Sequence, residues 1–198
     1  MWPRKKSHYS DLKSILSKKL EDATVVYETA EWKRTCEIAV GGLRAVGFFE
    51  GAEDPKLDKL LAIGSRGQTI IDCLSGKVTY RNRQEDGYDP QNLIAWDLSG
   101  QNAEPVRMSG VDGGGLNKAT LDGWSVECLP INWPIHHYVL QHPGGSLLSD
   151  HKLGRESRFD LIDFDLESLV WGFSNSGNNL LQTRFGDVIL WSRRNASR

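Results

Sequence analysis

The chain has 198 residues, with 24 Lys and Arg against 26 Asp and Glu, and its formal net charge is −2. This balance gives no overall attraction to nucleic acid. Hydrophobic residues make up 39% of the chain and charged residues 25%, which is ordinary globular usage and excludes a mainly disordered or collagen-like protein. A chain of this length buries about 70% of its extended surface, enough for one substantial core.

Cysteine usage and the N-terminal segment predict a soluble cytoplasmic protein. Cys36, Cys73 and Cys128 are far apart and odd in number, so neither a disulfide framework nor a CxxC zinc or redox site is expected. The chain starts with basic residues like a signal peptide, but charges interrupt the apolar stretch that should follow. No apolar run approaches the ~20 residues of a membrane-spanning helix. We therefore expect no membrane span, metal or cofactor.

An amphipathic helix is predicted over residues 7–21, with Ser7 or Ser10 as its N-cap. Its apolar positions recur at helical spacing: Leu12, Ile15, Leu16 and Leu20. Residues 1–20 hold six basic side chains against one acidic, a balance of +5 that leaves −7 for the rest. This basic face either is solvated while the leucines dock on the body, or serves a nucleic acid, an acidic membrane surface or an acidic partner.

The rest of the chain, residues 22–198, is predicted to form a single β-rich domain after the basic helix of residues 1–21. It consists of short runs rich in Val, Ile, Thr and aromatic residues, separated by Gly, Asn, Asp and Pro. Parallel pairs need crossovers of a dozen or more residues, so these closely spaced runs favour antiparallel meanders, in a partial propeller-like arrangement or a two-sheet sandwich. The predicted strands are residues 24–29, 36–40, 44–49, 60–64, 69–73, 77–81, 93–97, 124–129, 137–141, 159–164, 169–173, 180–183 and 188–192.

The order of the strands is echoed within the chain. The first copy is read from residues 46–49, 60–64, 69–72 and 75–78, and the second from residues 171–174, 180–181 and 188–191. An acidic insertion at residues 50–58 lengthens the first hairpin of the first copy. If the two copies lie side by side, we predict that Trp171 and Trp191 lie on a surface of the last strands and that the N-terminal portion closes the sheet by pairing with the C-terminal one.

Each copy resembles a blade of a WD-repeat β-propeller, in which a Gly-Phe strand and a leucine-rich strand lead through a glycine turn to an apolar strand ending near Trp. The Gly-His dipeptide that usually opens such a blade is missing, and Trp191-Ser192 stands where the family has Trp-Asp. At about 40–45 residues per blade, the chain holds at most about four blades. The strand at residues 60–64 and the Gly76-Lys77-Val78 turn also make the first copy similar to the SUKH-type immunity families.

The middle of the chain is where we expect a site. Residues 110–115 carry four glycines, but Leu116-Asn117 follow where a phosphate loop needs Lys and Ser or Thr, so a flexible loop is the simpler interpretation. Trp124 and Trp133 lie close to glycine and proline, which suits an aromatic recognition surface. The same two side chains would equally well cap the core.

Histidines cluster in the following segment, at His136, His137, His142 and His151, with Asp150 beside the last. Adjacent histidines on a strand point to opposite faces, so a metal site would use His137, His142 and Asp150. Asp163 and Asp165 share the wet face of a predicted strand, where an exposed pair lacks the contrasting environments of acid–base catalysis. No serine elbow or cysteine nucleophile motif is present, and no catalytic residue is predicted.

These patterns favour a non-enzymatic protein-binding module whose acidic surface attracts a basic partner. Compact acidic proteins of this kind resemble bacterial toxin-immunity proteins, and the resemblance implies neutralisation of a toxin domain by direct binding. A metal-dependent hydrolase at the histidine cluster and a nucleic-acid or membrane-surface adaptor at the basic helix are the alternatives. The predicted binding residues are Glu53, Asp54, Asp58, Glu85, Asp86, Asp112, Trp124 and Trp133.

Overall fold

The computed structural model describes residues 8–50, 57–85, 87–132, 135–152, 154, 158–162, 168–184 and 186–194. These residues form sixteen strands and two helices, and the predicted mainly β fold with antiparallel meanders and an N-terminal helix is confirmed. They close no propeller or barrel. The chain divides into two compact parts, unit 1 (Met1–Tyr27 with Asp122–Leu166) and unit 2 (Glu28–Leu121 with Glu167–Arg198). This division differs from the single domain predicted over residues 22–198.

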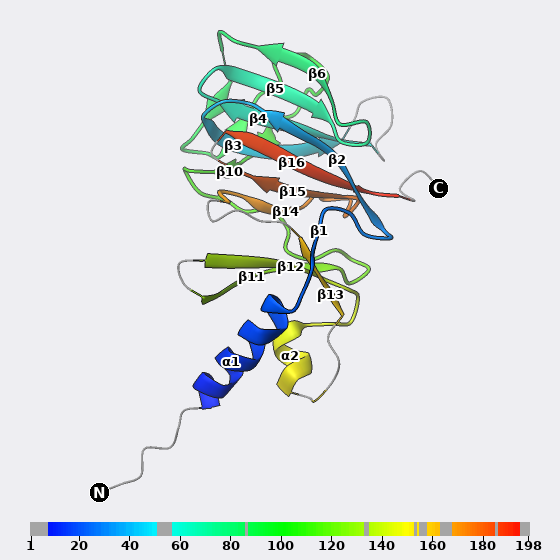
Figure 1. Cartoon of the computed structure of the whole chain (residues 1–198). Helices are drawn as coiled ribbons and strands as arrows, with labels where there is room; N and C mark the ends of the chain where they lie inside the picture. Colours follow the sequence, from blue (N-terminus) through cyan, green and yellow to red (C-terminus); the bar gives the residue numbers. More distant parts are fainter. Residues whose placement is uncertain are drawn as a thin grey trace, which may run out of the picture. The chain divides into compact units, whose positions relative to one another are not determined.

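The first sheet of unit 2 has the strand order β10-β3-β4-β5-β6 (Figure 1). Its strands are β3 (Leu43–Glu50), β4 (Asp58–Gly64), β5 (Gly67–Asp72), β6 (Lys77–Asn82) and β10 (Ser109–Gly110). All of its pairs are antiparallel, and short turns connect β4 to β5 and β5 to β6. In the β5–β6 turn Gly76 has φ +68°, and a Cβ there would lie 2.4 Å from the Thr35 carbonyl oxygen. This turn therefore requires glycine.

The second sheet of unit 2 joins the two ends of the chain. Its strands, in spatial order, are β14 (Trp171–Phe173), β15 (Asn179–Thr183), β16 (Asp187–Arg193) and β2 (Trp32–Ala39). Strand β2 pairs with β16 along its whole length, from Ala39 opposite Asp187 to Trp32 opposite Arg193. The prediction that the N-terminal portion pairs with the C-terminal one is thus confirmed.

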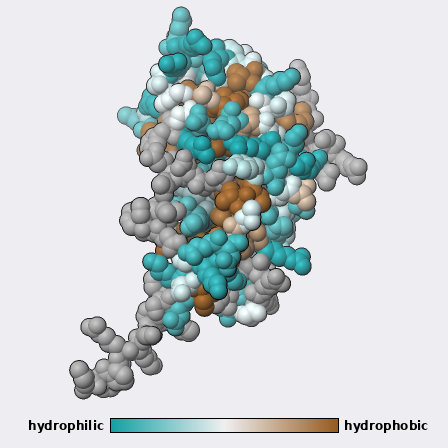
Figure 2. All heavy atoms as spheres, in the orientation of Figure 1, coloured by the Kyte–Doolittle hydropathy of each residue, from teal (hydrophilic) through white to brown (hydrophobic). Residues whose placement is uncertain are grey.

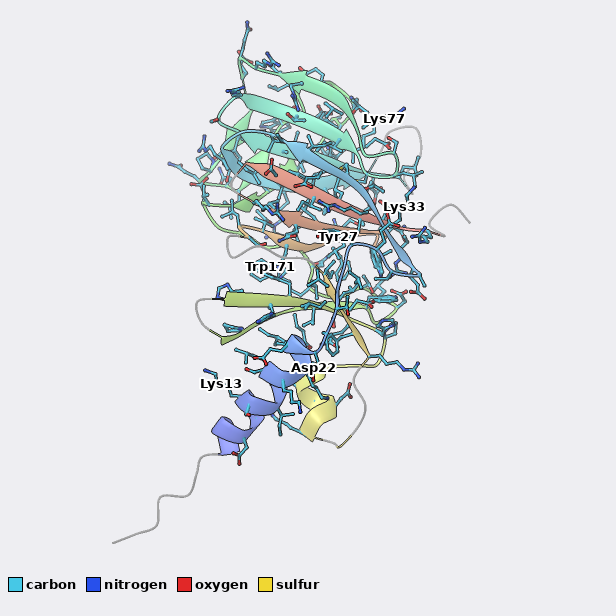
Figure 3. All side chains as sticks on the ribbon, viewed as in Figure 1. Lys13, Asp22, Tyr27, Lys33, Lys77 and Trp171 are labelled. Carbon is cyan, nitrogen blue, oxygen red and sulfur yellow. The ribbon has the colours of Figure 1, made fainter. Side chains whose placement is uncertain are left out.

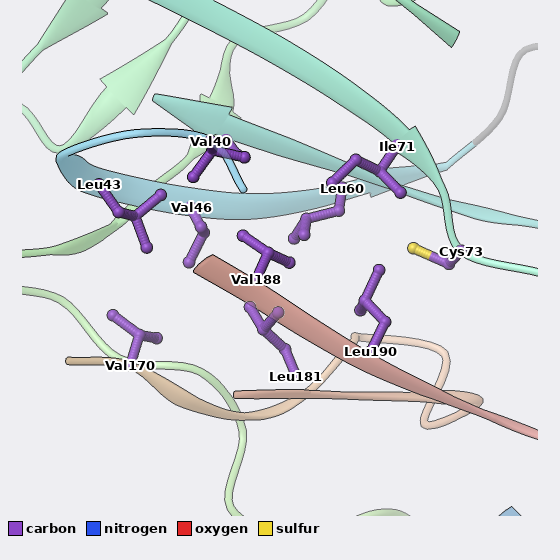
Figure 4. Close-up of a cluster of buried hydrophobic side chains, with 11 residues drawn as sticks. Val40, Leu43, Val46, Leu60, Ile71, Cys73, Val170, Leu181, Val188 and Leu190 are labelled. Atoms are coloured by element: carbon purple, nitrogen blue, oxygen red, sulfur yellow. The ribbon is translucent and has the colours of Figure 1, made fainter. Parts of the chain in front are cut away.

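The first and second sheets of unit 2 share one buried apolar cluster (Figure 4). The first sheet contributes Val46, Leu60 and Ile71, and the second contributes Leu181 and Leu190, all fully buried. Burying a side chain of this size stabilises a fold by about 1.5–3 kcal/mol. The two copies of the sequence echo form separate sheets that pack on a common core, so the side-by-side arrangement considered from the sequence is wrong.

The tryptophans of the second sheet differ from their predicted surface positions. Trp191 is only 2% exposed, so the prediction is wrong for this residue. Trp171, labelled in Figure 3, is half-buried, and the Lys118 ammonium lies 3.9 Å from the centroid of its ring. Trp32 is also buried, with its ring centroid 5.5 Å from that of Phe173. These indoles mostly fill the core of unit 2.

A small sheet covers the opposite face of the first one. It consists of β7 (Tyr88–Asp89), β8 (Ile94–Ala95) and β9 (Val106–Arg107), in that order. Ala95 and Val106 pack with Leu61, Ile63 and Ile70 in a second buried cluster. Alternation along the strands explains both clusters, because neighbouring residues of β4 and β5 point to opposite faces.

Unit 1 combines helix α1 with a small sheet of order β1-β13-β12-β11. Its elements are α1 (His8–Glu21), β1 (Val25–Val26), β11 (Ser125–Asn132), β12 (Ile135–Gln141), α2 (Leu147–Lys152) and β13 (Phe159–Ile162). Leu16 and Leu20 of α1 are buried with Leu129, Val139 and Leu161, as the predicted amphipathic helix requires. Strands β1 and β13 are parallel, in contrast to the meander pattern elsewhere.

Asp58 is not part of an exposed acidic surface, and its predicted surface role is wrong. Its side chain is 4% exposed. Its Oδ2 atom accepts hydrogen bonds from the Ser176 hydroxyl at 2.5 Å and from the Asn179 amide at 2.6 Å. The Ser192 hydroxyl lies 2.6 Å from Asn179 Oδ1 and donates to the Cys73 carbonyl at 2.8 Å. This polar network joins the two sheets beside their apolar cluster.

Replacing this carboxylate should destabilise unit 2. Asp58→Ala leaves the Ser176 and Asn179 donors without their acceptor, and we expect a loss of about 2–4 kcal/mol in the free energy of unfolding. Glu104→Ala, an exposed acidic position in the same unit, should change it by less than about 0.5 kcal/mol. Equilibrium urea unfolding measures both variants. Equal stability of the two would contradict the structural role of the network.

Candidate functional site

The acidic residues predicted to bind a partner are placed very differently. Four of the eight predicted binding residues lie outside the described part of the chain: Glu53, Asp54, Asp86 and Trp133. Glu85 and Asp112 are exposed on unit 2, as an interaction surface requires. The predicted acidic surface is thus reduced, among described residues, to these two carboxylates.

Trp124 belongs to the interior of unit 1. Its side chain is 5% exposed, so the interpretation as a recognition surface is wrong and the alternative core position holds. Its ring centroid lies 4.7 Å from that of His142, and His142 Nε2 is 3.1 Å from Asp160 Oδ2. The indole therefore packs against a histidine that a carboxylate orients.

Arg44 lies close to Asp112 and lines a surface depression together with Glu85. A surface depression of about 500 Å³ on unit 2 is lined by Arg44, Arg83, Glu85 and Gly87, among others. The Arg44 guanidinium lies 3.9 Å from the Asp112 carboxylate, outside a tight hydrogen-bond distance. Arg44 therefore lies near the exposed Asp112 and lines the same depression as the exposed Glu85.

Tyr88 lies under the same guanidinium. The Arg44 Cζ atom is 5.4 Å from the centroid of the Tyr88 ring, which is a cation–π geometry. Burial, and to a smaller extent the Asp112 carboxylate, raises the pKa of Tyr88 to about 12. The phenol therefore stays protonated at neutral pH.

Trp96 is an aromatic residue that the sequence analysis placed only within a strand. Its side chain is 51% exposed. Its backbone N–H donates to the Gly87 carbonyl at 3.0 Å. Gly87 lines the depression that Arg44 and Glu85 also line. The strand alternation was the available signal, because Ala95 faces the core and its neighbour must then face solvent.

A buried amide fixes the backbone on which Trp96 is carried. Gln68, on β5, is fully buried. Its Nε2 donates to the Trp96 carbonyl at 2.8 Å, and its Oε1 accepts from the Leu98 N–H at 2.9 Å. The Asp97 carboxylate accepts from the N–H groups of Ser99, at 2.7 Å, and Asn102, at 2.8 Å. Hydrogen bonds within the protein therefore hold the loop that carries the exposed indole in one conformation.

The glycine-rich stretch at residues 110–115 is closely packed in part, which differs from the predicted flexible loop. Gly110 pairs with Ala45, and a Cβ at Gly110 would lie 1.9 Å from the Arg44 carbonyl oxygen. Gly114 and Gly115 line a second cavity of about 440 Å³ in unit 2. Its lining also includes three asparagines and two phenylalanines: Asn92, Asn117, Asn175, Phe48 and Phe173.

The histidine cluster does not converge on one point among the described side chains. No group of three His, Cys, Asp or Glu side chains that could hold a metal ion occurs in the described residues. Asp150 is buried and accepts a hydrogen bond from the Ser146 N–H at 2.9 Å, at the start of α2. The side chain of His151, and both Asp163 and Asp165, lie outside the described residues.

The cysteines are free thiols in the structure. Burial raises the pKa of Cys36 to about 11 and that of Cys73 well above its ordinary value. A thiol reacts as its thiolate, so neither residue is activated as a nucleophile at neutral pH.

No protein-family model matches the chain, and no curated protein matches it in sequence. Among the described helices, none has the length and apolar character that crossing a membrane requires.

His137 makes unit 1 sensitive to pH. Burial lowers its pKa below the ordinary value of 6.5, and the Glu21 carboxylate partly opposes this effect. Below pH 6.5 the unfolded chain takes up a proton that the folded chain resists, so stability falls as the pH decreases through this value. We expect urea unfolding at pH 7.5 and 5.5 to show a smaller loss for His137→Gln than for the unchanged protein. An identical loss would rule out this residue as the cause.

Proposed function

We propose that the protein is a non-enzymatic, cytoplasmic protein-binding module that grips its partner through the surface around Trp96. We define this surface by Arg44, Glu85, Tyr88, Trp96 and Asp112. The observation that carries the proposal is a half-exposed tryptophan on a backbone that a buried glutamine holds in place. Tryptophan, tyrosine and arginine dominate the binding energy of protein interfaces.

The chemistry of the Trp96 surface matches that of an interface. A large aromatic side chain provides contact area at low entropic cost, and a loop that is already ordered loses little further freedom on binding. Glu85, Arg44 and Asp112 provide a polar rim that can pair with charges on a partner. The face of the molecule drawn in Figure 2 is mostly hydrophilic with separate apolar patches.

The proposed biological setting is neutralisation of a toxin domain by direct binding, as in bacterial immunity proteins. Two observations support it. Residues 21–198 carry a balance of −7, which attracts a basic partner over a distance. Glu85 and Asp112 place part of this charge on the Trp96 surface. The toxin class is an analogy from size and charge.

Exposed Trp96 can be removed without disturbing the core. We expect Trp96→Ala to reduce partner affinity by about 2 kcal/mol or more, roughly thirtyfold, while the unfolding free energy stays within about 0.5 kcal/mol. Leu74→Ala, at another exposed apolar position of unit 2, is the matched control and should keep partner binding. Tagged proteins captured from lysate of the native host, followed by mass spectrometry, identify a stoichiometric partner for the affinity measurement. Recovery of no basic partner, or equal binding by both variants, would count against the proposal.

The adaptor alternative is less well supported by the fold. Leu16 and Leu20 of α1 are buried within unit 1, so a membrane-surface role would depend on exposed lysines such as Lys13 and Lys18 (Lys13 is labelled in Figure 3). Such binding would weaken steeply with salt and would be lost on deleting residues 1–20.

A further inference from the structure

Three arginines line one small cavity of unit 2. Arg66 lies in the turn between β4 and β5, Arg81 lies on β6, and Arg83 follows the end of β6. The cavity has a volume of about 190 Å³, and Thr69 and Gly41 also contribute to its lining. None of its lining residues is acidic.

The strand register explains why these residues meet. Thr69 and Arg81 are direct partners in the β5–β6 pair. Arg81 and Arg83 are two positions apart, the spacing that places side chains on one face of an extended segment. The Asn82 Oδ1 atom accepts hydrogen bonds from the N–H groups of Gln84, at 2.9 Å, and Glu85, at 3.3 Å, which fixes the chain after Arg83.

The positive charge of the cavity is not neutralised within the described part of the chain. No carboxylate there forms an ion pair with the guanidinium of Arg66, Arg81 or Arg83. Glu37 of the neighbouring strand β2 is already paired with Arg34 and, at 3.5 Å, with Arg184. Three like charges at one cavity repel one another, so an anion placed between them would be attracted by all three.

The chemistry of the lining selects the kind of anion. Guanidinium groups present N–H donors in a planar fork that matches the oxygens of a phosphate or carboxylate. A cavity of about 190 Å³ has the room of several water molecules of ~30 Å³ each, which suits a single compact anion and a few waters. Three guanidinium groups that line one cavity attract a doubly charged tetrahedral anion more strongly than a singly charged planar one.

We propose that the cavity lined by Arg66, Arg81 and Arg83 binds a phosphate-type oxyanion, free or as the terminal group of a small phosphate ester. Arg83 also lines the depression beside the Trp96 surface, so the two sites adjoin, but phosphate binding does not require the proposed protein-binding function. The cavity is positively charged, whereas residues 21–198 as a whole carry a net charge of −7.

The full chain can be titrated with inorganic phosphate by calorimetry in a phosphate-free buffer of low salt. We expect Arg81→Gln with Arg83→Gln to weaken binding by at least about tenfold. Arg66→Gln, in a turn outside the strands, tests the same cavity should the double variant fold poorly, and it should also weaken binding. Lys77→Gln removes one exposed charge from the same strand β6 (Lys77 is labelled in Figure 3) and should leave binding unchanged.

Two further titrations test the identity of the anion. Acetate at equal ionic strength should bind much more weakly than phosphate. Adenosine monophosphate tests a phosphate ester: binding that Arg66→Gln weakens extends the site to esters, whereas binding of inorganic phosphate alone assigns it to the free anion. The proposal is overturned if the unchanged protein does not bind phosphate, if acetate binds equally well, or if Lys77→Gln weakens phosphate binding as much as Arg66→Gln.

Discussion

The packing of two meander sheets on one shared core is the constraint on which unit 2 depends. Neither sheet can cover its own apolar face, and together they bury side chains such as Leu60 and Leu190 completely. The Asp58 network adds direction to this non-directional packing, because its hydrogen bonds join β4 to β15 at fixed positions. A slip by one residue in either sheet would expose apolar side chains and leave a buried carboxylate without its donors.

Strand β5 connects this packed core to an exposed loop. The same strand places Ile71 in the shared core and Gln68 beneath the loop of Trp96. The glutamine amide bonds the Trp96 carbonyl and the Leu98 N–H, and it thereby ties the loop that carries the exposed indole to the sheet. The register of β5 with β6 also brings Thr69 and Arg81 together at a cationic cavity, which shares Arg83 with the depression near Trp96. Binding by such surfaces needs little ordering of the protein.

Local pattern predicted much of this fold, because strand alternation and turn residues act over a few positions. The echo identified both meanders of unit 2, and pairing of the N-terminal part with the last strand followed from it. Long-range burial was beyond such patterns. Asp58 at a strand start looks solvated in sequence, and only Ser176 and Asn179, far along the chain, make its burial favourable. Strand alternation indicates the exposure of the Trp96 side chain, but the fixed backbone beneath it depends on Gln68, which is remote in sequence.

Amide hydrogen exchange of the free protein tests the preformed Trp96 loop most directly. The N–H groups of Trp96 and Leu98 donate to the Gly87 carbonyl and to Gln68 Oε1, so we predict that both exchange at least about 100-fold more slowly than in an unstructured peptide. Gln68→Ala should release the Leu98 amide first. Exchange of both amides at unstructured rates in the unchanged protein would show that the indole stands on a mobile segment, and it would contradict recognition by a surface formed in advance.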